Sequence, residues 1–272
     1  MKKTIAIIGH GYVGKAMKNF FKDDFNILIF DPANKKYKDT KEEINNNADL
    51  AVICVPTPIS ENGEADLEFV SESFDWLEVE LVVIKSTVPP LTTKKLQLKY
   101  PEKKICFSPE YIGEGKYKTP VDEKFPDSRD VKKHNFLIIG GESSEIIGEY
   151  FRTVMGDSIT YKYVDSTTAE LCKYMENSFL GTKVTFCNSF YELAGIMDVD
   201  YDELRELWLL DGRIGVSHTL VFKDDRGFSG KCLPKDISAI VNFSKKMGYD
   251  LDLLKSVLEV NEKFLNKNNI RE

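Results

Sequence analysis

The chain has few cysteines and histidines for its 272 residues, and their spacing argues against several kinds of site. The cysteines are odd in number and include no Cys-x-x-Cys pair, so we expect no disulfide framework. The histidines are scattered without the spacing of metal ligands, so we expect no metal. These residues are Cys54, Cys106, Cys172, Cys187 and Cys232, with His10, His134 and His218.

Excess positive charge and long apolar runs are also missing. The net charge of −7 argues against nucleic acid or an anionic membrane as the main partner. No run approaches the roughly 20 apolar residues of a membrane helix. The opening "MKKTIAIIGHG" is too short and too rich in glycine for a signal peptide, so we expect a cytoplasmic protein. With 42% hydrophobic and 30% charged residues, the composition is that of a globular protein with a real core.

The first half of the chain alternates short apolar runs with helical patterns. The runs, which predict strands, are "TIAIIG", "NILIFD", "LAVICVP", "LVVIKST", "KICFSPE" and "NFLIIGG". The helical patterns cover 14–22, 66–79, 92–98 and 144–155. Such alternation predicts an α/β fold with a Rossmann-like, doubly wound and mostly parallel sheet over residues 1–165.

After residue 165 the pattern becomes helical. A proline-free stretch of helical spacing begins at Asp165 and Ser166, which are both N-cap candidates with Glu170 close behind, and it predicts one long central helix. Further helical segments are expected near 201–210 and 236–267. We therefore predict an all-helical second domain, residues 166–272, that follows the Rossmann-like first domain.

A glycine motif after the first strand indicates a dinucleotide site. The Gly-x-Gly-x-x-Gly pattern lets backbone N–H groups approach a pyrophosphate at a helix N-terminus. Asp31 ends the second strand, where a carboxylate binds an adenosine ribose and repels a 2′-phosphate, so NAD is favoured over NADP. The expected cofactor residues are Gly9, Gly11, Tyr12, Val13, Gly14 and Asp31. The alternative is a glycine turn that binds no ligand.

Two more motifs end predicted strands. "CVPTP" closes the third strand and "KSTVPP" the fourth, and ligands of doubly wound sheets bind beyond such carboxyl ends. Pro56, Thr57, Ser86 and Thr87 are therefore candidates to line the cofactor cleft. Turn capping is the alternative for these side chains, and for Ser86 the two are equally weighted.

Polar groups with catalytic potential lie in the second half. Cys232, in "RGFSGKCLPKD", is either an apolar filler or a nucleophile, and the stretch alone does not decide between them. Lys173 and Asn177 are spaced i, i+4, so they share a helix face that is either solvated or catalytic. Their apolar neighbours and the position just after the cofactor domain favour the catalytic interpretation.

The ordered motifs resemble those of the nucleotide-sugar 6-dehydrogenases of the UDP-glucose/GDP-mannose dehydrogenase family, above all the UDP-glucose 6-dehydrogenases. The motifs are "GYVG", "VPTP" with "GEADLEFV", "KSTVPP", "SPEYIGEG", "AELCKYMENSF", "GRIGVSH" and "GFSGKCLPKD". The resemblance implies two successive NAD-dependent oxidations of a sugar C6 alcohol to a carboxylate, with UDP-glucose favoured. It also implies a homodimer built on the long helix.

The resemblance also implies roles for individual residues. Cys232 matches the nucleophile that forms a thiohemiacetal and then a thioester. Lys173 and Asn177 match groups that hold the reacting oxygen, and Asp236 matches an acid-base partner. The remaining matches are Glu114 and Thr87 for positioning water, Glu110 and Lys235 in supporting roles, Gly230 beside the substrate, and Arg213, which reaches a partner's substrate.

The chain also departs from the family pattern. The third, nucleotide-binding domain has no counterpart before Glu272, so we expect a dimer that binds NAD and turns over UDP-glucose weakly or not at all. Gly113 stands where an arginine is usual, and Ser229 where a glycine is usual. Two alternatives remain at this point: a two-domain β-hydroxyacid dehydrogenase with one hydride transfer, and a non-catalytic NAD-binding dimer.

Overall fold

The computed structural model describes residues 2–34, 36–37, 39–112 and 130–269. They form two compact units, and the division falls inside one long helix. The first unit holds the described residues up to 173 except 61–64, and the second holds 61–64 and the residues from 174 onward. Glu114 and Gly113, named from the sequence, lie outside the described residues. The domain ranges 1–165 and 166–272 stay a prediction.

The first unit is built on a seven-stranded sheet in the order β2-β1-β3-β4-β5-β6-β7. All neighbouring strands are parallel except the pair β5 and β6, as expected for a doubly wound fold. The strands are β1 (Thr4–Ile8), β2 (Asn26–Phe30), β3 (Leu50–Ile53), β4 (Leu81–Ile84), β5 (Lys104–Phe107), β6 (Phe136–Gly140) and β7 (Thr160–Val164). The predicted α/β class is confirmed.

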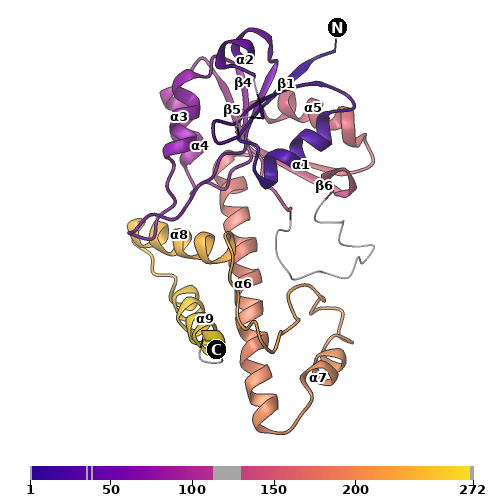
Figure 1. Ribbon diagram of the computed structural model, residues 1–272, viewed down its shortest axis with the longest axis vertical. Helices are drawn as coiled ribbons and strands as arrows, with labels where there is room; N and C mark the ends of the chain where they lie inside the picture. Colours follow the sequence, from indigo (N-terminus) through magenta and orange to yellow (C-terminus); the bar gives the residue numbers. More distant parts are fainter. Residues whose placement is uncertain (1, 35, 38, 113–129, 270–272) are drawn as a thin grey trace. The chain divides into compact units, whose positions relative to one another are not determined.

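Helices cover both faces of this sheet. They are α1 (Tyr12–Phe21), α2 (Lys41–Asn47), α3 (Glu68–Trp76), α4 (Thr92–Lys99) and α5 (Ser144–Met155), with a short 3₁₀ turn at Val131–Lys133. Figure 1 shows α1 and α5 on one side and α3 and α4 on the other. Successive side chains of a strand point to opposite faces, so Ile5 and Ile7 join one apolar core while Ala6 and Ile8 join the other. This is why the strands read as continuous apolar runs.

The sequence patterns missed two elements of the first unit. Strand β7 lies at the edge of the sheet and reads "TYKYV", with Tyr161 and Tyr163 against the core and polar residues between them. Helix α2 reads "KEEINNN" and buries one apolar side chain, Ile44. Its signal is a capping box, since Thr40 accepts from the backbone of Glu43 and Glu43 accepts from that of Thr40.

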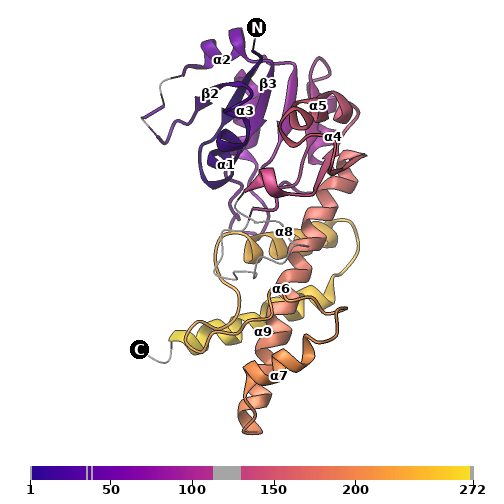
Figure 2. The ribbon, with the colours of Figure 1, turned by 90° about the vertical axis from the view of Figure 1, so that its right-hand side faces the viewer.

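The second unit is helical, as predicted. It contains the rest of α6 (Ser166–Ile196), with α7 (Tyr201–Trp208), α8 (Leu233–Lys246) and α9 (Asp252–Asn269). Figures 1 and 2 show these three helices arranged along α6. The helices α6 and α8 approach closely, because a side chain at Gly181 would come within 2.4 Å of Ile237. Among the described residues, no helix is long and apolar enough to cross a membrane.

The single helix expected near 236–267 is wrong, since α8 and α9 are separate. The break follows two lysines in the last turn of α8 and lies at Gly248. Its φ of +83° is a backbone conformation that other residues rarely adopt. Gly248 and Tyr249 donate backward to the carbonyls of Lys245 and Ser244, which is a common way for a helix to end.

Helix α6 begins as the sequence predicted, at Asp165. The Asp165 carboxylate accepts from the backbone of Thr168 at 2.9 Å. Glu170, expected to assist this cap, instead lies fully buried and accepts from the backbone of Thr93 at 2.8 Å. Its second oxygen has no hydrogen-bond partner among the described residues. Burial therefore raises the pKa of Glu170 to about 7.

This carboxyl predicts a pH-dependent stability. A folded-state pKa of about 7, above the usual 4.5, gives a stabilising contribution that is complete below pH 4.5 and lost as the pH rises through 7. Glu170→Gln keeps an oxygen for Thr93 and removes the charge. We expect the variant to be more stable than the parent at pH 8, by about 1–3 kcal/mol, and similar at pH 5. Urea unfolding at both pH values measures this difference in stability.

Glu72→Gln, on an exposed face of α3, serves as the control. Equal changes in stability at both positions would refute the raised pKa of Glu170.

Candidate active site

The glycine motif forms the turn between β1 and α1. The backbone of Gly9 donates to Phe30 at 2.8 Å, which joins the turn to the end of β2. A side chain on Gly9 would meet the Cys54 carbonyl at 2.8 Å, and one on Gly14 would meet the Gly9 carbonyl at 2.1 Å. A side chain on Gly11 would meet nothing within 4 Å. The outer two glycines are thus required by packing, and Gly11 leaves the helix N-terminus open to an approaching phosphate.

Asp31 follows β2 and contacts the same turn. One carboxylate oxygen accepts from the backbone of His10 at 2.9 Å, and the other accepts from Ala33 at 3.0 Å. Tyr12 and Val13, in the first turn of α1, are exposed and half-buried respectively. This geometry fits a dinucleotide, with a carboxylate held beside the open glycine turn.

The ends of β3 and β4 are tied together by hydroxyl groups. Thr57 donates to the carbonyl of Thr87 at 2.9 Å, and Ser86 donates to the carbonyl of Val55 at 2.6 Å. Ser86 is buried, so its hydroxyl supports the edge of the sheet. Pro56 is exposed and Thr87 half-buried at the same edge. Cofactor contact by these residues remains a prediction.

A buried charged cluster lies beyond the ends of β4 and β5. The Lys173 ammonium lies 3.5 Å from the carboxylate of Glu110, with only 6% and 11% of the two side chains exposed. The ammonium also lies over the ring of Tyr111, 5.1 Å from its centroid. The second Glu110 oxygen accepts from the backbone of Ile112 at 2.8 Å. Lys173 is therefore on a buried face of α6, which excludes the solvated alternative for this residue.

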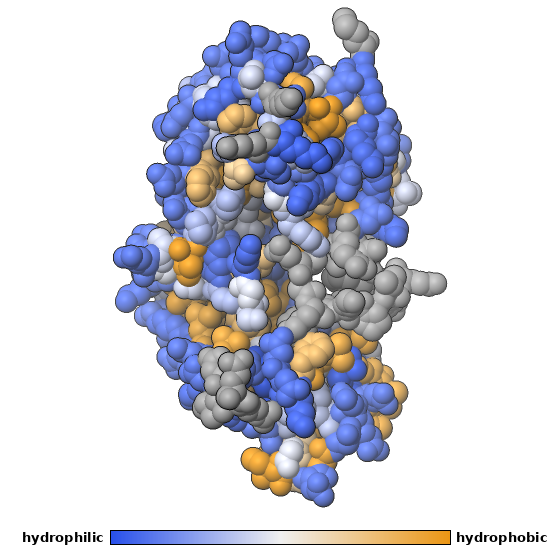
Figure 3. Space-filling view, in the orientation of Figure 1, coloured by the Kyte–Doolittle hydropathy of each residue, from blue (hydrophilic) through white to orange (hydrophobic). Residues whose placement is uncertain are grey.

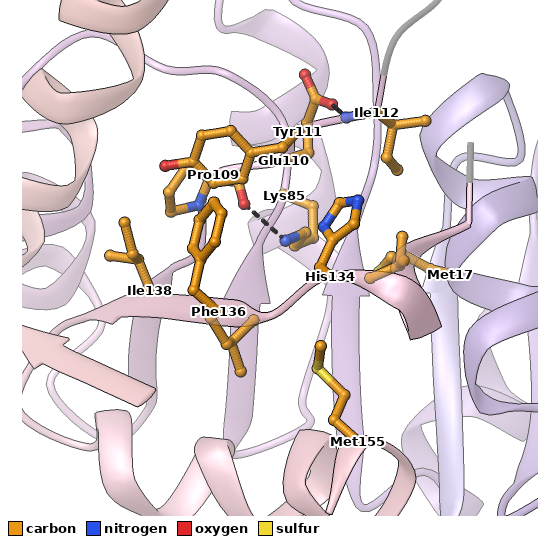
Figure 4. Close-up of a pocket in the computed structure, with 12 residues that line it drawn as sticks. Met17, Lys85, Pro109, Glu110, Tyr111, Ile112, His134, Phe136, Ile138 and Met155 are labelled. Atoms are coloured by element: carbon orange, nitrogen blue, oxygen red, sulfur yellow. Dashed lines mark hydrogen bonds between the residues drawn. The ribbon is translucent and has the colours of Figure 1, made fainter. Parts of the chain in front are cut away.

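Lys85 is a member of this neighbourhood that the sequence patterns missed. Its ammonium donates to the hydroxyl of Ser108 at 3.2 Å and to the carbonyl of Pro109 at 3.0 Å. Figure 4 shows the second of these bonds, with Glu110 and His134 lining the same small cavity. Burial lowers the pKa of Lys85 to about 8, while the Glu110 carboxylate opposes that shift. The sequence did offer one indication of a buried lysine, because Lys85 directly follows the apolar run in "LVVIKST".

The second unit holds a buried carboxylate of its own. Asn177 donates to Asp236 at 2.6 Å, and the ammonium of Lys235 lies 2.7 Å from the other oxygen of that carboxylate. Asp236 and Asn177 are 1% and 5% exposed. Three residues that the sequence singled out separately are thus in contact, in an arrangement that holds the Asp236 carboxylate in one orientation.

Cys232 is the N-cap of α8 and is exposed. The other cysteines, all within the described residues, are less accessible: Cys172 is half-buried, and Cys54, Cys106 and Cys187 are buried. Burial raises the pKa of Cys54 and Cys106 to about 12 and also raises that of Cys187. Cys232 is thus the thiol best placed for reaction, because a helix N-terminus favours a thiolate.

Two predicted substrate residues are exposed. Gly230 lies in the loop before Cys232. Arg213 projects from the segment after α7 with 89% of its side chain exposed, and its Nε donates to Asp211 at 3.0 Å. Lys183 on α6 holds that segment by donating to the Ile214 carbonyl at 2.9 Å. Among the described residues, no group of three metal-ligating side chains occurs.

Two family models match the chain, both from one family. The NAD binding domain of the UDP-glucose/GDP-mannose dehydrogenase family matches residues 33–146, and the central domain of the same family matches residues 167–263. The glycine motif and Asp31 precede the first matched range.

Curated relatives are UDP-glucose 6-dehydrogenases. A UDP-glucose 6-dehydrogenase of Rickettsia felis is 33% identical over 225 residues, which is 79% of this chain and 48% of that protein. The UDP-glucose 6-dehydrogenase TuaD of Bacillus subtilis is 28% identical over 304 residues, covering 96% of this chain and 63% of that one. The chain thus spans about half the length of the first of these relatives.

Solved structures show the same architecture. A UDP-glucose dehydrogenase from Pyrobaculum islandicum has a TM-score of 0.78 at 25% identity, covering 97% of this chain and 68% of that one. A 3-hydroxyisobutyrate dehydrogenase from Mycobacterium tuberculosis has a TM-score of 0.67 at 16% identity, covering 97% and 94% of the two chains. At that identity the second likeness concerns the fold alone.

Proposed function

The chain belongs to the UDP-glucose/GDP-mannose dehydrogenase family, and we propose from this premise that it oxidises the C6 alcohol of a nucleotide sugar to a carboxylate. UDP-glucose is the favoured substrate. The observation that carries the proposal is the pairing of buried Lys173 with Glu110 and of buried Asn177 with Asp236. Burying four such polar groups costs free energy of folding unless the groups are paired, and buried charged clusters of this kind are common at functional sites.

NAD supplies the hydride acceptor when it is bound. The glycine turn would hold its pyrophosphate against the N-terminus of α1, and Asp31 would accept from the adenosine ribose hydroxyls. Thr57, Ser86 and Thr87, beyond the carboxyl ends of β3 and β4, would line the nicotinamide end of the site. The assignment of the pyrophosphate rests on the open turn at Gly11.

The first oxidation requires a group that takes the hydroxyl proton and steadies the oxygen. Lys173 and Asn177, one turn apart on α6, would hold that oxygen by hydrogen bonds. Glu110 keeps the Lys173 ammonium in place. Gly230 and Arg213 would contact the substrate farther from the reacting carbon, Arg213 from a second copy of the chain.

The second oxidation uses Cys232. The thiolate sulfur would bond to the aldehyde carbon as the carbonyl oxygen takes up a proton, which gives a thiohemiacetal. Its carbon would then give up a hydride, for which bound NAD would supply the acceptor, and its hydroxyl would give up a proton. The product is a thioester on the same sulfur. Water adds to the thioester carbon, the carbon–sulfur bond breaks, and a carboxylate and the thiol are released. The balance is one alcohol, two NAD and one water to one carboxylate, two NADH and three protons.

Hydrolysis of the thioester needs a positioned water. Asp236 is held by Asn177 and Lys235 and would accept a proton from that water. Thr87, together with Glu114 outside the described residues, would orient it. We also assign to Asp236 the alcohol proton of the first oxidation, because its carboxylate contacts Asn177, which would hold the reacting oxygen.

The test is product counting. The protein is incubated with NAD and each of a panel of UDP- and GDP-sugars, and NADH and uronate are measured per substrate consumed. Two NADH and one uronate support the proposal. One NADH per substrate, obtained instead with a 3-hydroxyacid, supports the β-hydroxyacid alternative, whose fold is similar. NAD binding without turnover of either nucleotide sugars or 3-hydroxyacids supports a non-catalytic dimer. Separately, tighter binding of NADP than of NAD contradicts the role of Asp31.

We propose further that the protein forms a homodimer through α6 and α7. Large apolar side chains are exposed along these helices, at a spacing that forms a stripe on α6. They include Met175 (75% exposed), Phe179 (63%), Phe186 (47%), Phe190 (43%), Leu193 (47%), Met197 (64%) and Leu207 (63%). Figure 3 shows apolar surface over the end of α6 and over α7. A contiguous patch of this kind favours burial against a second copy.

The dimer proposal predicts the effect of one double substitution. Phe190→Lys combined with Leu193→Lys places two charges in the stripe. We expect the parent to sediment as a dimer at micromolar concentration and the variant as a monomer, because buried unpaired charges oppose association. Leu98→Lys, at a leucine on α4 that is 76% exposed, is the control and should remain dimeric. A parent that is monomeric in sedimentation would disprove this proposal.

A further inference from the structure

The main chain that leads to Cys232 is held by side-chain amides from two helices. Asn261, on α9, accepts from the backbone of Phe228 at 2.7 Å and donates to its carbonyl at 2.9 Å. Asn268, one to two turns later on α9, does the same for Arg226, at 3.0 and 3.1 Å. An amide that makes both bonds replaces a strand partner for that residue.

Asn188, on α6, holds the residue between them. Its side-chain oxygen accepts from the backbone of Gly227 at 3.1 Å and from the Nε of Arg226 at 2.8 Å. Asn188 and Asn261 are 1% and 4% exposed. Buried polar main chain without partners would be costly, so these bonds select one path for the segment.

Arg226 strengthens the same anchor. Its guanidinium is 2.7 Å from the carboxylate of Glu192, lies over the ring of Tyr191 at 4.2 Å, and also donates to the Asn188 carbonyl at 3.0 Å. Lys267, on α9, lies 2.7 Å from the other oxygen of Glu192. The helices α6 and α9 are thus linked through the segment that they hold.

The reactive thiol lies on an exposed tip between two buried anchors. Residues 226–228 are buried, 229–232 are exposed, and Asp236 and Ile237 are buried again. Phe228 and Ile237 pack in one apolar cluster. Asn177 fixes the later anchor through Asp236, and Asn188 fixes the earlier one, so α6 supports both ends of the tip.

We propose that Asn188, Asn261 and Asn268 are positioning residues for the thiol of Cys232. This inference rests on the proposed role of that thiol and adds residues that the two-step chemistry does not itself name. Hydride removal from the alcohol does not need the sulfur, whereas attack on the aldehyde requires it at bonding distance. A misplacement of about 1 Å can cost 100-fold in such a step. Loosening the earlier anchor therefore slows the second oxidation and spares the first.

The matched pair for the test is Asn188→Leu and Asn188→Asp. Aspartate keeps the acceptor for Gly227 and Arg226, while leucine removes it. With a nucleotide sugar that the parent oxidises, the leucine variant releases trappable aldehyde at least tenfold more often, and NADH per substrate falls from two toward one. The aspartate variant behaves within twofold of the parent. Unchanged partition in a folded leucine variant, shown by normal NAD binding, overturns the proposal.

A second variant and a second measurement keep the test decisive if the leucine variant does not fold. Asn261→Asp keeps the acceptor for the backbone of Phe228 and loses the donor, so its aldehyde release lies between the parent and the leucine variant. Amide hydrogen exchange requires no turnover. Exchange at Gly227 becomes at least tenfold faster in Asn188→Leu, and exchange at Phe228 becomes at least tenfold faster in Asn261→Leu, because each variant removes the acceptor of that amide, with β1 to β5 unchanged. If exchange is faster but the protein oxidises no sugar, the role of the asparagines in holding residues 226–228 stands, and only the proposed function is refuted. If exchange is unchanged, that role itself is refuted.

Discussion

Replacing Cys232 with serine is expected to stop the reaction after its first oxidation. A serine hydroxyl is a far weaker nucleophile than a thiolate, so the aldehyde is no longer captured efficiently. We expect uronate formation to fall by at least about 1,000-fold, which corresponds to about 4 kcal/mol of barrier. Any acyl group that does form on serine is an oxygen ester, which hydrolyses more slowly and is detectable as a covalent adduct by intact-protein mass spectrometry.

The matched control is Cys172→Ser. Cys172 is half-buried on α6, and no role in the chemistry is assigned to it. We expect this variant to form uronate at a rate similar to that of the parent. If Cys232→Ser also produced uronate at the parent rate, the nucleophile assignment would be wrong, and Cys232 would only occupy the N-cap position of α8.

Replacing Lys173 with methionine should lower both activity and stability. The ammonium would no longer hold the reacting oxygen, and the loss of one such donor costs about 100- to 1,000-fold in kcat. The substitution also leaves the carboxylate of Glu110 buried without its cation. Removing one partner of a buried pair typically destabilises a protein by about 3–5 kcal/mol. Turnover and urea unfolding measure the two effects.

A double substitution separates the two effects. Glu110→Gln keeps an oxygen for the backbone of Ile112 and removes the orphaned charge. Lys173→Met combined with Glu110→Gln should regain most of the stability and none of the activity. The control is Lys99→Met, which breaks a surface pair with Asp75 whose side chains are 58% and 62% exposed. That change should cost less than about 1 kcal/mol. Recovery of activity in the double variant would show that Lys173 acts only as a structural partner.

Regular patterns made much of the first unit predictable from the sequence. Apolar runs bounded by turn residues located six strands, because strands buried on both faces need no alternation. The edge strand β7 and the polar helix α2 were missed, because each buries few apolar side chains and leaves a weak pattern. The break between α8 and α9 was missed because one glycine within a helical pattern is compatible with continuation.

The candidate site was likewise predictable from the sequence only in part. Ordered motifs were sufficient to identify the family and to select Cys232, Lys173, Asn177 and Asp236. Their burial and pairing were not predictable, because spacing along one helix does not say which face is covered. Lys85 and the asparagines that hold residues 226–228 were absent from the sequence-based set, since no pattern distinguishes a buried amide from a solvated one.

By itself, the sequence determined most of the order of strands and helices, the glycine turn and the candidate reactive side chains, because these depend on local spacing and residue type. Only the tertiary structure decided the contacts between distant residues. It placed Glu110 beside Lys173, Asp236 beside Asn177, and Asn261 against Phe228. The physical reason is that desolvation and hydrogen bonding depend on what packs against a group, and in these three pairs that neighbour comes from a distant part of the chain.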